Sequence, residues 1–224
     1  GPITQSLNDQ MIPFVDFDGS GPALFFAHAN GYPPGAYGPL LTTLASHYHV
    51  RAIQFRPLWP DAQPDGMRDW QPFVEDVIQW IDEQSETAVI GVGHSLGAIA
   101  ILAAALRRHR GGARHPQSFS DARGRVQHDG FAAFTAPLRL LAISDDHDFA
   151  PPRAVAALAA IYRNAPVEVI TLRPEDYGRT RIGHFGFFRD DMTKAAWLDT
   201  ARWLGAQLPA ATRSARTALL ANAA

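Results

Sequence analysis

The pentapeptide Gly93-His94-Ser95-Leu96-Gly97 contains a serine whose neighbours could make it a nucleophile. A short apolar run precedes this G-x-S-x-G pattern and an Ala-rich segment follows it, so the chain is expected to turn sharply from a strand into a helix at Ser95. Such a turn strains the backbone and lifts the hydroxyl above the end of the sheet. The N–H of Leu96, at the start of the helix, is then the natural first donor to a developing oxyanion. Because the pattern also occurs by chance, it needs partners elsewhere in the chain.

Two groups downstream could supply those partners. A serine hydroxyl is a poor nucleophile at neutral pH, so it requires a base, and the base requires an acid that orients it. An acidic run that contains Asp146 and Asp148 follows the strand expected to end at Ile143, and α/β sheets bind their ligands at the carboxyl ends of such strands. The next strand leads to His184. The order serine, acid, histidine is the one that accompanies a G-x-S-x-G turn.

Each of these residues also has an ordinary structural interpretation. An aspartate just before a helix is more often an N-cap than a catalyst, and a lone histidine beside a glycine is more often a simple loop residue. The three groups occur in the expected order, and each follows its own predicted strand. Taken together, Ser95, Asp146 and His184 therefore predict a catalytic triad.

The loop after the early strand, His28–Gly35, is expected to provide a second oxyanion donor. Gly31 allows the backbone to turn sharply there, which would direct the N–H of Tyr32 toward Ser95. Asn30 is the alternative donor and a candidate substrate-binding residue. Trp59 lies two residues after one proline and directly before another, in a loop that follows a strand, and is the candidate for lining an acyl pocket.

The secondary-structure pattern predicts the scaffold that would hold these residues. Apolar runs typical of buried strands occur at Ala23–Ala27, His49–Phe55, Ala88–Val92, Leu138–Ile143 and Val167–Leu172. Helical patterns occur at Gly38–His47, Trp70–Gln84, Leu96–Arg110, Pro152–Asn164 and Asp191–Gln207. Strands that alternate with helices indicate an α/β fold, in which a mostly parallel sheet has helices on both faces.

Composition narrows the classes of function. The 224 residues are 46% hydrophobic and 19% charged with a net charge of -2, which fits one folded domain and gives no electrostatic signature for nucleic acid or an anionic membrane. No cysteine is present, which excludes a disulfide framework, a thiolate zinc site and a cysteine nucleophile. No metal site, phosphate-binding loop or dinucleotide fingerprint is evident, so no cofactor is expected. A signal-peptide pattern and a membrane-length apolar run are also missing, and the expected location is the cytoplasm.

Taken together, these motifs resemble the α/β-hydrolase superfamily over nearly the whole chain, to about Gln207. The first half is similar to one group of small bacterial α/β-hydrolases, and the second half to a different group of predicted hydrolases. The segments that carry these likenesses are His28–Pro34, Arg56–Pro60, Gly93–Gly97, Ile143–Asp146, Ala150–Pro152 and Ile182–Arg189. The resemblance implies an α/β-hydrolase domain over residues 3–208, followed by an Ala-rich tail at 209–224.

The resemblance leaves two points open. An aspartate four residues before a proline is the superfamily pattern and fits Asp148 with Pro152, whereas the double-aspartate pattern of the second group points to Asp146. We favour Asp146 because it lies nearer the end of its strand. The superfamily also places a strand and a helical cap after the nucleophile helix, and the irregular stretch 111–135 predicts a cap that is reduced or absent. Either Arg125-Val126-Gln127 is a minimal replacement strand, or the chain is shortened or recombined near residues 110 to 120.

The resemblance implies a serine hydrolase that cleaves a carboxylic ester or related acyl bond of a small molecule through an acyl-enzyme intermediate. Acyl transfer, peptidase action and carbon–carbon bond hydrolysis are alternatives on the same triad, since fold does not determine reaction. A catalytically weak or engineered scaffold is the non-enzymatic alternative, motivated by the irregular stretch 111–135. Substrate identity and oligomeric state do not follow from the sequence.

Overall fold

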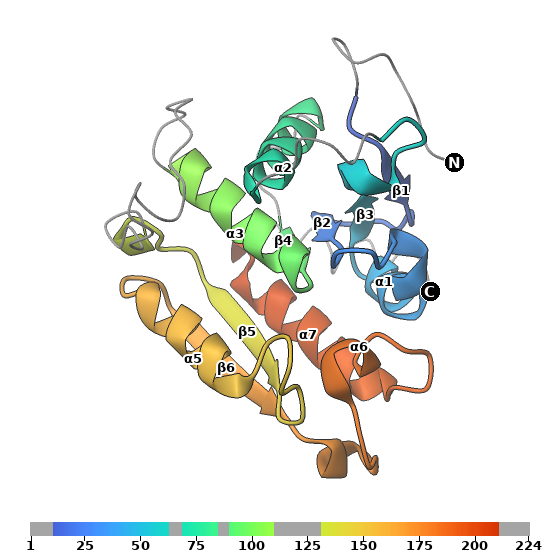
Figure 1. The fold of residues 1–224 in the computed structure, drawn as a ribbon, viewed down its shortest axis with the longest axis vertical. Coiled ribbons are helices and arrows are strands. Elements are labelled where there is room, and N and C mark those ends of the chain that lie inside the picture. Colours follow the sequence, from blue (N-terminus) through green and yellow to red (C-terminus); the bar gives the residue numbers. More distant parts are fainter. Residues whose placement is uncertain (1–10, 63–68, 85–89, 110–130, 211–224) are drawn as a thin grey trace.

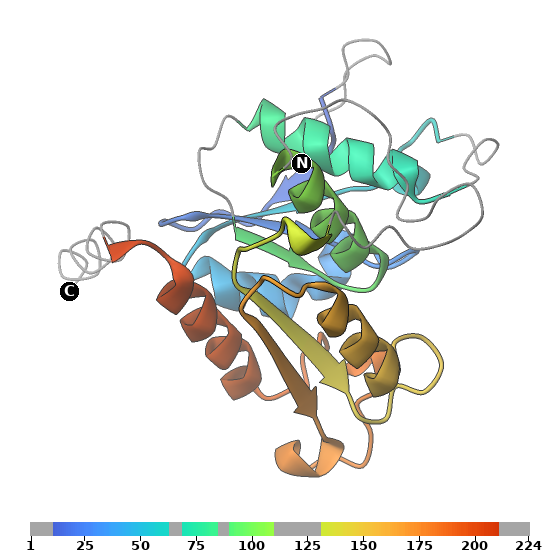
Figure 2. The ribbon, with the colours of Figure 1, turned by 90° about the vertical axis from the view of Figure 1, so that its left-hand side faces the viewer.

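The structure, a computed structural model, describes residues 11–62, 69–84, 90–109 and 131–210 (Figure 1). Its larger sheet has the strand order β1-β3-β2-β4, with β1 antiparallel to β3 and the other pairs parallel. These strands are β1 (Phe14–Asp16), β2 (Ala23–Ala27), β3 (His49–Ile53) and β4 (Ile90–Gly93). A second, parallel pair consists of β5 (Leu138–Ile143) and β6 (Val167–Leu172). Within the described residues, no ladder joins this pair to the larger sheet, from which it is set apart in Figure 2.

In the residues that the structure describes, six α-helices surround the two sheets. They are α1 (Gly38–Ala45), α2 (Gln71–Glu83), α3 (Leu96–His109), α5 (Pro152–Ile161), α6 (Gly183–Gly186) and α7 (Lys194–Gln207). Short 3-10 helices occur at Pro34–Tyr37, Arg56–Leu58 and Pro174–Tyr177. In the described part of the chain, no helix has both the length and the apolar character needed to cross a membrane.

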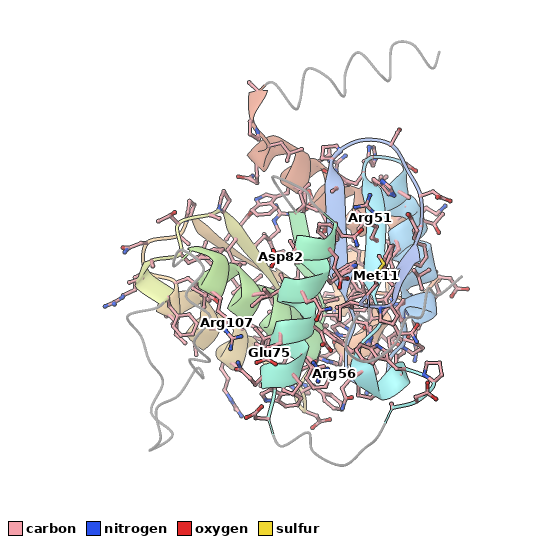
Figure 3. The ribbon with its side chains drawn as sticks, turned by 90° about the horizontal axis from the view of Figure 1, so that it is seen from above. Met11, Arg51, Arg56, Glu75, Asp82 and Arg107 are labelled. Carbon is pink, nitrogen blue, oxygen red and sulfur yellow. The ribbon has the colours of Figure 1, made fainter. Side chains whose placement is uncertain are left out.

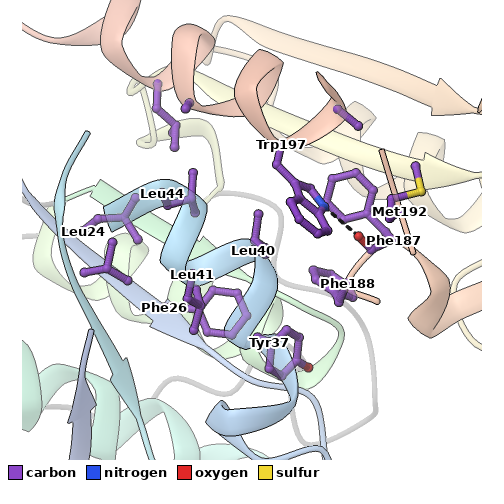
Figure 4. Close-up of a cluster of buried hydrophobic side chains, with 14 of the residues drawn as sticks. Leu24, Phe26, Tyr37, Leu40, Leu41, Leu44, Phe187, Phe188, Met192 and Trp197 are labelled. Carbon is purple, nitrogen blue, oxygen red and sulfur yellow. Dashed lines mark hydrogen bonds between the residues drawn. The ribbon is translucent and has the colours of Figure 1, made fainter. Parts of the chain in front are cut away.

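The strand β2 shows why helices cover both faces of the larger sheet. All five of its residues are buried, and because side chains alternate along a strand they enter two different cores. Leu24 and Phe26 pack with side chains of α1 and α7, including Trp197 (Figure 4). Phe25 packs on the opposite face with residues of α2 and α3. This strand is therefore the centre of a doubly covered sheet.

The helices α2 and α3 lie side by side on that second face (Figure 3). Glu75 of α2 acts electrostatically on Arg107 of α3, but burial is the larger influence and lowers the pKa of the guanidinium. The helix α2 is also tied to the loop after β3, because Arg56 Nε and Nη2 donate to the Asp76 carboxylate at 2.7–2.9 Å. Burial raises the pKa of Asp76, and the bonds from Arg56 oppose that rise. The loop that holds Trp59 is thus fixed against α2.

The predicted fold class, α/β with a mostly parallel sheet and helices on both faces, is confirmed. The predicted strands Ala23–Ala27, Leu138–Ile143 and Val167–Leu172 have the bounds that the structure shows. Both the antiparallel strand β1 and the short helix α6 were missing from the prediction. Residues 110–130, which include Arg125-Val126-Gln127, and residues 211–224 lie outside the described part, so the predictions made there stay predictions.

The helices α1 and α2 are two residues shorter than the predicted Gly38–His47 and Trp70–Gln84, and α5 and α7 are three residues shorter than predicted. The helix α7 begins at Lys194 rather than Asp191, because Arg179 holds Asp191 in the preceding loop through its carboxylate at 2.8 Å and its carbonyl at 2.9 Å. The helix α5 ends at Ile161 rather than Asn164, because Tyr162 leaves the helical conformation (φ -83°, ψ 61°) and its side chain is buried in a local aromatic cluster. In both cases a contact with residues outside the helix determines where the helix starts or stops.

Candidate active site

Ser95 lies at the turn between β4 and α3 and has a left-handed backbone, with φ at 54°. Among the described residues other than glycine, Asp18 alone shares a positive φ. A residue with a β carbon is strained in this conformation, and such strain persists only where the surrounding structure enforces it. The predicted strand–turn–helix therefore occurs at Ser95, with the serine in its strained position.

Two glycines enforce this turn because no side chain fits in their place. A β carbon at Gly97 would lie 2.0 Å from the carbonyl oxygen of Ala27, and one at Gly93 would lie 2.5 Å from the backbone nitrogen of Ala98. The N–H of His94 donates to the same Ala27 oxygen at 3.0 Å. The turn is thus pressed against the end of β2, beside the loop that begins at His28.

Asp146 and His184 form a buried hydrogen-bonded pair. His184 Nδ1 lies 2.6 Å from Asp146 Oδ2, and the two side chains are only 6% and 4% exposed. The carboxylate also accepts the backbone N–H groups of Phe149 and Ala150, each at 3.2 Å. Burial raises the pKa of Asp146, but the bonds from His184 and these two N–H groups outweigh it and lower the pKa overall. The carboxylate is therefore ionised at neutral pH and keeps the Nδ1 proton of His184 directed toward itself.

The neighbouring carboxylate holds the loop that carries His184. Asp145 accepts the N–H of Ile182 at 3.0 Å and the N–H of Gly183 at 2.9 Å. Gly183 has a φ of 64°, a conformation that glycine adopts without strain. The two adjacent aspartates after β5 therefore have different roles. Asp145 fixes the backbone before His184, and Asp146 fixes the His184 ring. Asp148 is exposed, and it is Asp146 whose carboxylate is hydrogen-bonded to the His184 ring.

His184 also lies beside the turn that carries Ser95. Its ring centroid is 4.5 Å from that of His94, the residue directly before the serine. In the described part of the chain, no hydrogen bond within 3.5 Å joins the Ser95 hydroxyl to the His184 ring. The structure therefore brings the serine and the histidine to one place without closing the bond between them.

The predicted oxyanion donors differ in what they already bind. Leu96 is the first residue of α3, so its N–H has no hydrogen-bond acceptor within the helix. The N–H of Tyr32 instead donates to the Ala29 carbonyl at 3.2 Å, within a turn of its own loop. The structure therefore disfavours the preferred choice of Tyr32, because its N–H is used locally. The alternative, Asn30, lies in an exposed part of the same loop.

Trp59 and Phe149 differ in their contacts with the residues of the candidate site. Trp59 donates from Nε1 to the carbonyl of Gln54 at 2.7 Å, lies under Arg56 and packs on the core beside α2. None of these described contacts brings it to the site. Phe149 is 68% exposed and stacks on the His184 ring at 4.8 Å, a position that no sequence pattern indicated.

The sequence prediction also missed Tyr37, His94 and Asp145. The acidic run after β5 was a signal for Asp145. Two adjacent side chains at a strand end point in different directions, so only one of the two carboxylates is expected to bind the His184 ring. For Tyr37 no local signal exists, since it meets His94 across 57 positions of sequence. Among the described residues, no group of three or more His, Asp or Glu side chains is placed to hold a metal ion.

The sequence profile of the Alpha/beta hydrolase family matches residues 24–223. This match covers most of the chain, and the chain belongs to the α/β-hydrolase family. No curated protein sequence matches it.

Solved structures of several hydrolases share the fold. A thermophilic esterase from Thermogutta terrifontis is 14% identical with a TM-score of 0.65, and the match covers 91% of this chain and 97% of that one. Naproxen esterase from Bacillus subtilis is 11% identical with a TM-score of 0.64 and 91% coverage of both chains. A haloalkane dehalogenase loop variant from Bradyrhizobium elkanii is 13% identical with a TM-score of 0.64, covering 92% of this chain and 97% of that one. At these identities the likeness concerns the fold alone.

Proposed function

We propose that the protein is a serine hydrolase that cleaves a carboxylic ester or related acyl bond. The observation that carries this proposal is the buried Asp146–His184 pair, with its 2.6 Å bond, beside the strained turn that holds Ser95. Asp146 fixes the tautomer of His184 in which Nδ1 carries the proton, and this leaves Nε2 free to accept one. A neutral imidazole with a free Nε2 is the base that a serine nucleophile requires.

The proposed reaction proceeds in two stages. Ser95 Oγ attacks the carbonyl carbon while His184 takes the hydroxyl proton, and the same proton then passes to the leaving alcohol as the acyl-enzyme forms. Water, activated by His184, attacks the acyl-enzyme and releases the acid and the free serine. Oxyanion stabilisation is assigned to the N–H of Leu96 and, in the second position, to that of Asn30 in preference to Tyr32.

The missing bond between Ser95 and His184 is compatible with this proposal. Hydrogen bonds of this kind are often long in proteins without substrate and shorten only in the reacting complex. Rotation of the Ser95 side chain about its Cα–Cβ bond changes the position of the hydroxyl relative to His184 without moving the backbone. The esterases among the fold neighbours support ester hydrolysis as the first activity to test.

The test combines a fluorophosphonate probe with turnover of p-nitrophenyl acetate. We expect the probe to label Ser95, and we expect Ser95→Ala to lose both labelling and turnover by at least ~1000-fold, because the hydroxyl forms the covalent intermediate. Ser46→Ala, a change at an exposed serine that ends α1, is the matched control and should keep both. Labelling and turnover that survive in Ser95→Ala would refute the proposal.

A further inference from the structure

A buried tyrosine connects two of the loops that meet at the candidate site. Tyr37 is fully buried, and its hydroxyl oxygen accepts the N–H of Ala29 at 2.9 Å. The same oxygen lies 2.8 Å from Nδ1 of His94. Burial raises the pKa of Tyr37, so the group keeps its proton at neutral pH. Ala29 precedes Asn30, and His94 precedes Ser95, so the hydroxyl joins the proposed oxyanion loop to the nucleophile turn.

The protons in this network can be assigned from their partners. The N–H of Ala29 can only donate, so the hydroxyl hydrogen of Tyr37 is free to point at Nδ1 of His94. Burial, with a further contribution from His184, lowers the pKa of His94 to about 3. The ring is therefore neutral, accepts at Nδ1 and carries its hydrogen on Nε2.

The opposite edge of His94 faces the segment that carries the proposed base. Its ring centroid lies 4.5 Å from that of His184 and 4.2 Å from that of Phe188. Nε2 of His94 is buried and has no hydrogen-bond partner within 3.5 Å in the described residues. His94 therefore contacts the segment that carries the proposed base through its ring, by packing on His184 and Phe188.

We infer that Tyr37 and His94 are positioning residues that hold the oxyanion loop, the nucleophile turn and the base segment in register. This inference rests on the proposed function, since it assigns roles to those three segments. The network contacts no reacting atom, so it acts through Asn30, Ser95 and His184. Catalysis is sensitive to shifts of about 1 Å in such groups, and a buried polar network restricts such shifts.

The test is Tyr37→Phe, which removes one oxygen and leaves Ala29 N–H and His94 Nδ1 without their partner. We expect kcat for p-nitrophenyl acetate to fall ~10- to 100-fold, with KM changed less than about threefold, because the groups that act in the transition state lose their alignment. The matched control is Tyr162→Phe, which removes another buried hydroxyl. That hydroxyl has no hydrogen-bond partner among the described residues, and the Tyr162 ring packs on Phe131 and Phe134, so kcat should stay within about twofold.

Both variants are assayed well below their melting temperatures, so that a loss of folded protein does not mimic a loss of kcat. If Tyr37→Phe retains the kcat of Tyr162→Phe, the positioning role is overturned. His94→Asn provides the second test, because it keeps an acceptor for Tyr37 but loses the ring that reaches His184. We expect His94→Asn to lower kcat by a larger factor than it changes KM. An unchanged kcat in His94→Asn overturns the inference as well.

The tests of the positioning residues and the test of the proposed function give separate results. Fluorophosphonate labelling of Ser95 in the wild type, lost in Ser95→Ala, establishes the nucleophile regardless of the two positioning variants. Failure of that labelling removes the proposed function. Normal labelling with equal kcat in Tyr37→Phe and Tyr162→Phe removes only the network.

Discussion

The larger sheet and the β5–β6 pair hold their parts of the candidate site by different means. Around the larger sheet, β2 is buried throughout, and Leu41 and Leu44 of α1 are fully buried. In the second region, most residues of β5 and β6 are only partly buried, and α5 has no buried residue at all. Ile143 and Leu172, at the carboxyl ends of the two strands, are the points where this pair enters the main core.

This difference explains why the two regions hold their functional groups differently. Ser95 is fixed by close packing, because Gly97 allows its turn to touch the backbone of β2. Asp146 lies in the loop after β5 and His184 in the short helix α6 after β6, and hydrogen bonds to Asp145 and Asp146 fix these two segments. Packing should therefore determine stability in the first region, and polar contacts should determine activity in the second.

The largest expected effect comes from breaking the polar contact at Asp146. Asp146→Asn should lower kcat for p-nitrophenyl acetate by ~1000- to 10 000-fold, because an amide no longer holds the Nδ1 proton of His184 and the base takes the wrong tautomer. Steady-state kinetics on the purified variant provide the measurement. Asp148→Asn, an equal change at an exposed position of the same loop, should keep activity within about threefold. An equal loss in both variants would instead make Asp148 part of the acid function.

A pair of leucine truncations compares packing in the two regions. Leu41→Ala should lower the free energy of unfolding by ~2–5 kcal/mol, because Leu41 is 0% exposed and its loss leaves a cavity in the main core. Leu158→Ala on α5 should cost only about 1 kcal/mol, because Leu158 is partly buried against a smaller cluster. Urea denaturation measures both values. Equal losses would contradict the difference in packing between the regions.

Acid should destabilise the first region through its buried histidines. Because the pKa of His94 is about 3 in the folded protein and 6.5 in its ordinary state, the unfolded chain binds a proton first as pH falls. Stability is therefore complete above pH 6.5 and is lost progressively toward pH 3, at about 1.4 kcal/mol per pH unit. Burial lowers the pKa of His28 as well, which acts in the same direction.

This acid sensitivity can be measured with a variant that does not titrate. Between pH 7 and pH 5, the wild type should lose about 2 kcal/mol more stability than His94→Phe, by urea denaturation at the two pH values. Other titratable groups near His94, such as Tyr37, His184 and Asp146, remain in both proteins, so their contribution largely cancels. Parallel losses in the two proteins would show that His94 is not the group responsible.

The sequence predicted the fold well wherever local pattern decides structure. The strand Ala23–Ala27 is a continuous apolar run and is buried throughout, whereas Leu138–Ile143 and Val167–Leu172 are mostly apolar runs that are only partly buried. The turn at Ser95 was also predicted from local pattern. Strand and helix pass so closely there that only glycine fits at positions 93 and 97. The end of α5 and the start of α7 were less accurate, since Tyr162 and Arg179 set them through contacts distant in sequence.

The candidate site was predicted in its order but not in its supporting contacts. The placement of Asp146 beside His184 agrees with the preference for the residue nearer the strand end. The supporting role of Asp145 and the network through Tyr37 depend on how separate loops meet in space, which no periodicity encodes. The choice of Tyr32 as donor stays a prediction, and the bond from its N–H to the Ala29 carbonyl is a contact within its own loop that no periodicity encodes.

The left-handed backbone of Ser95 has a consequence for how this sequence evolves. Glycine would adopt the same φ of 54° without a β carbon to strain, so selection for thermal stability alone would favour glycine at this position. Under the proposed function, the reactivity of the Ser95 hydroxyl offsets this cost in folding free energy. If that reactivity were no longer needed, drift toward glycine at position 95 would be among the earliest signs of its loss.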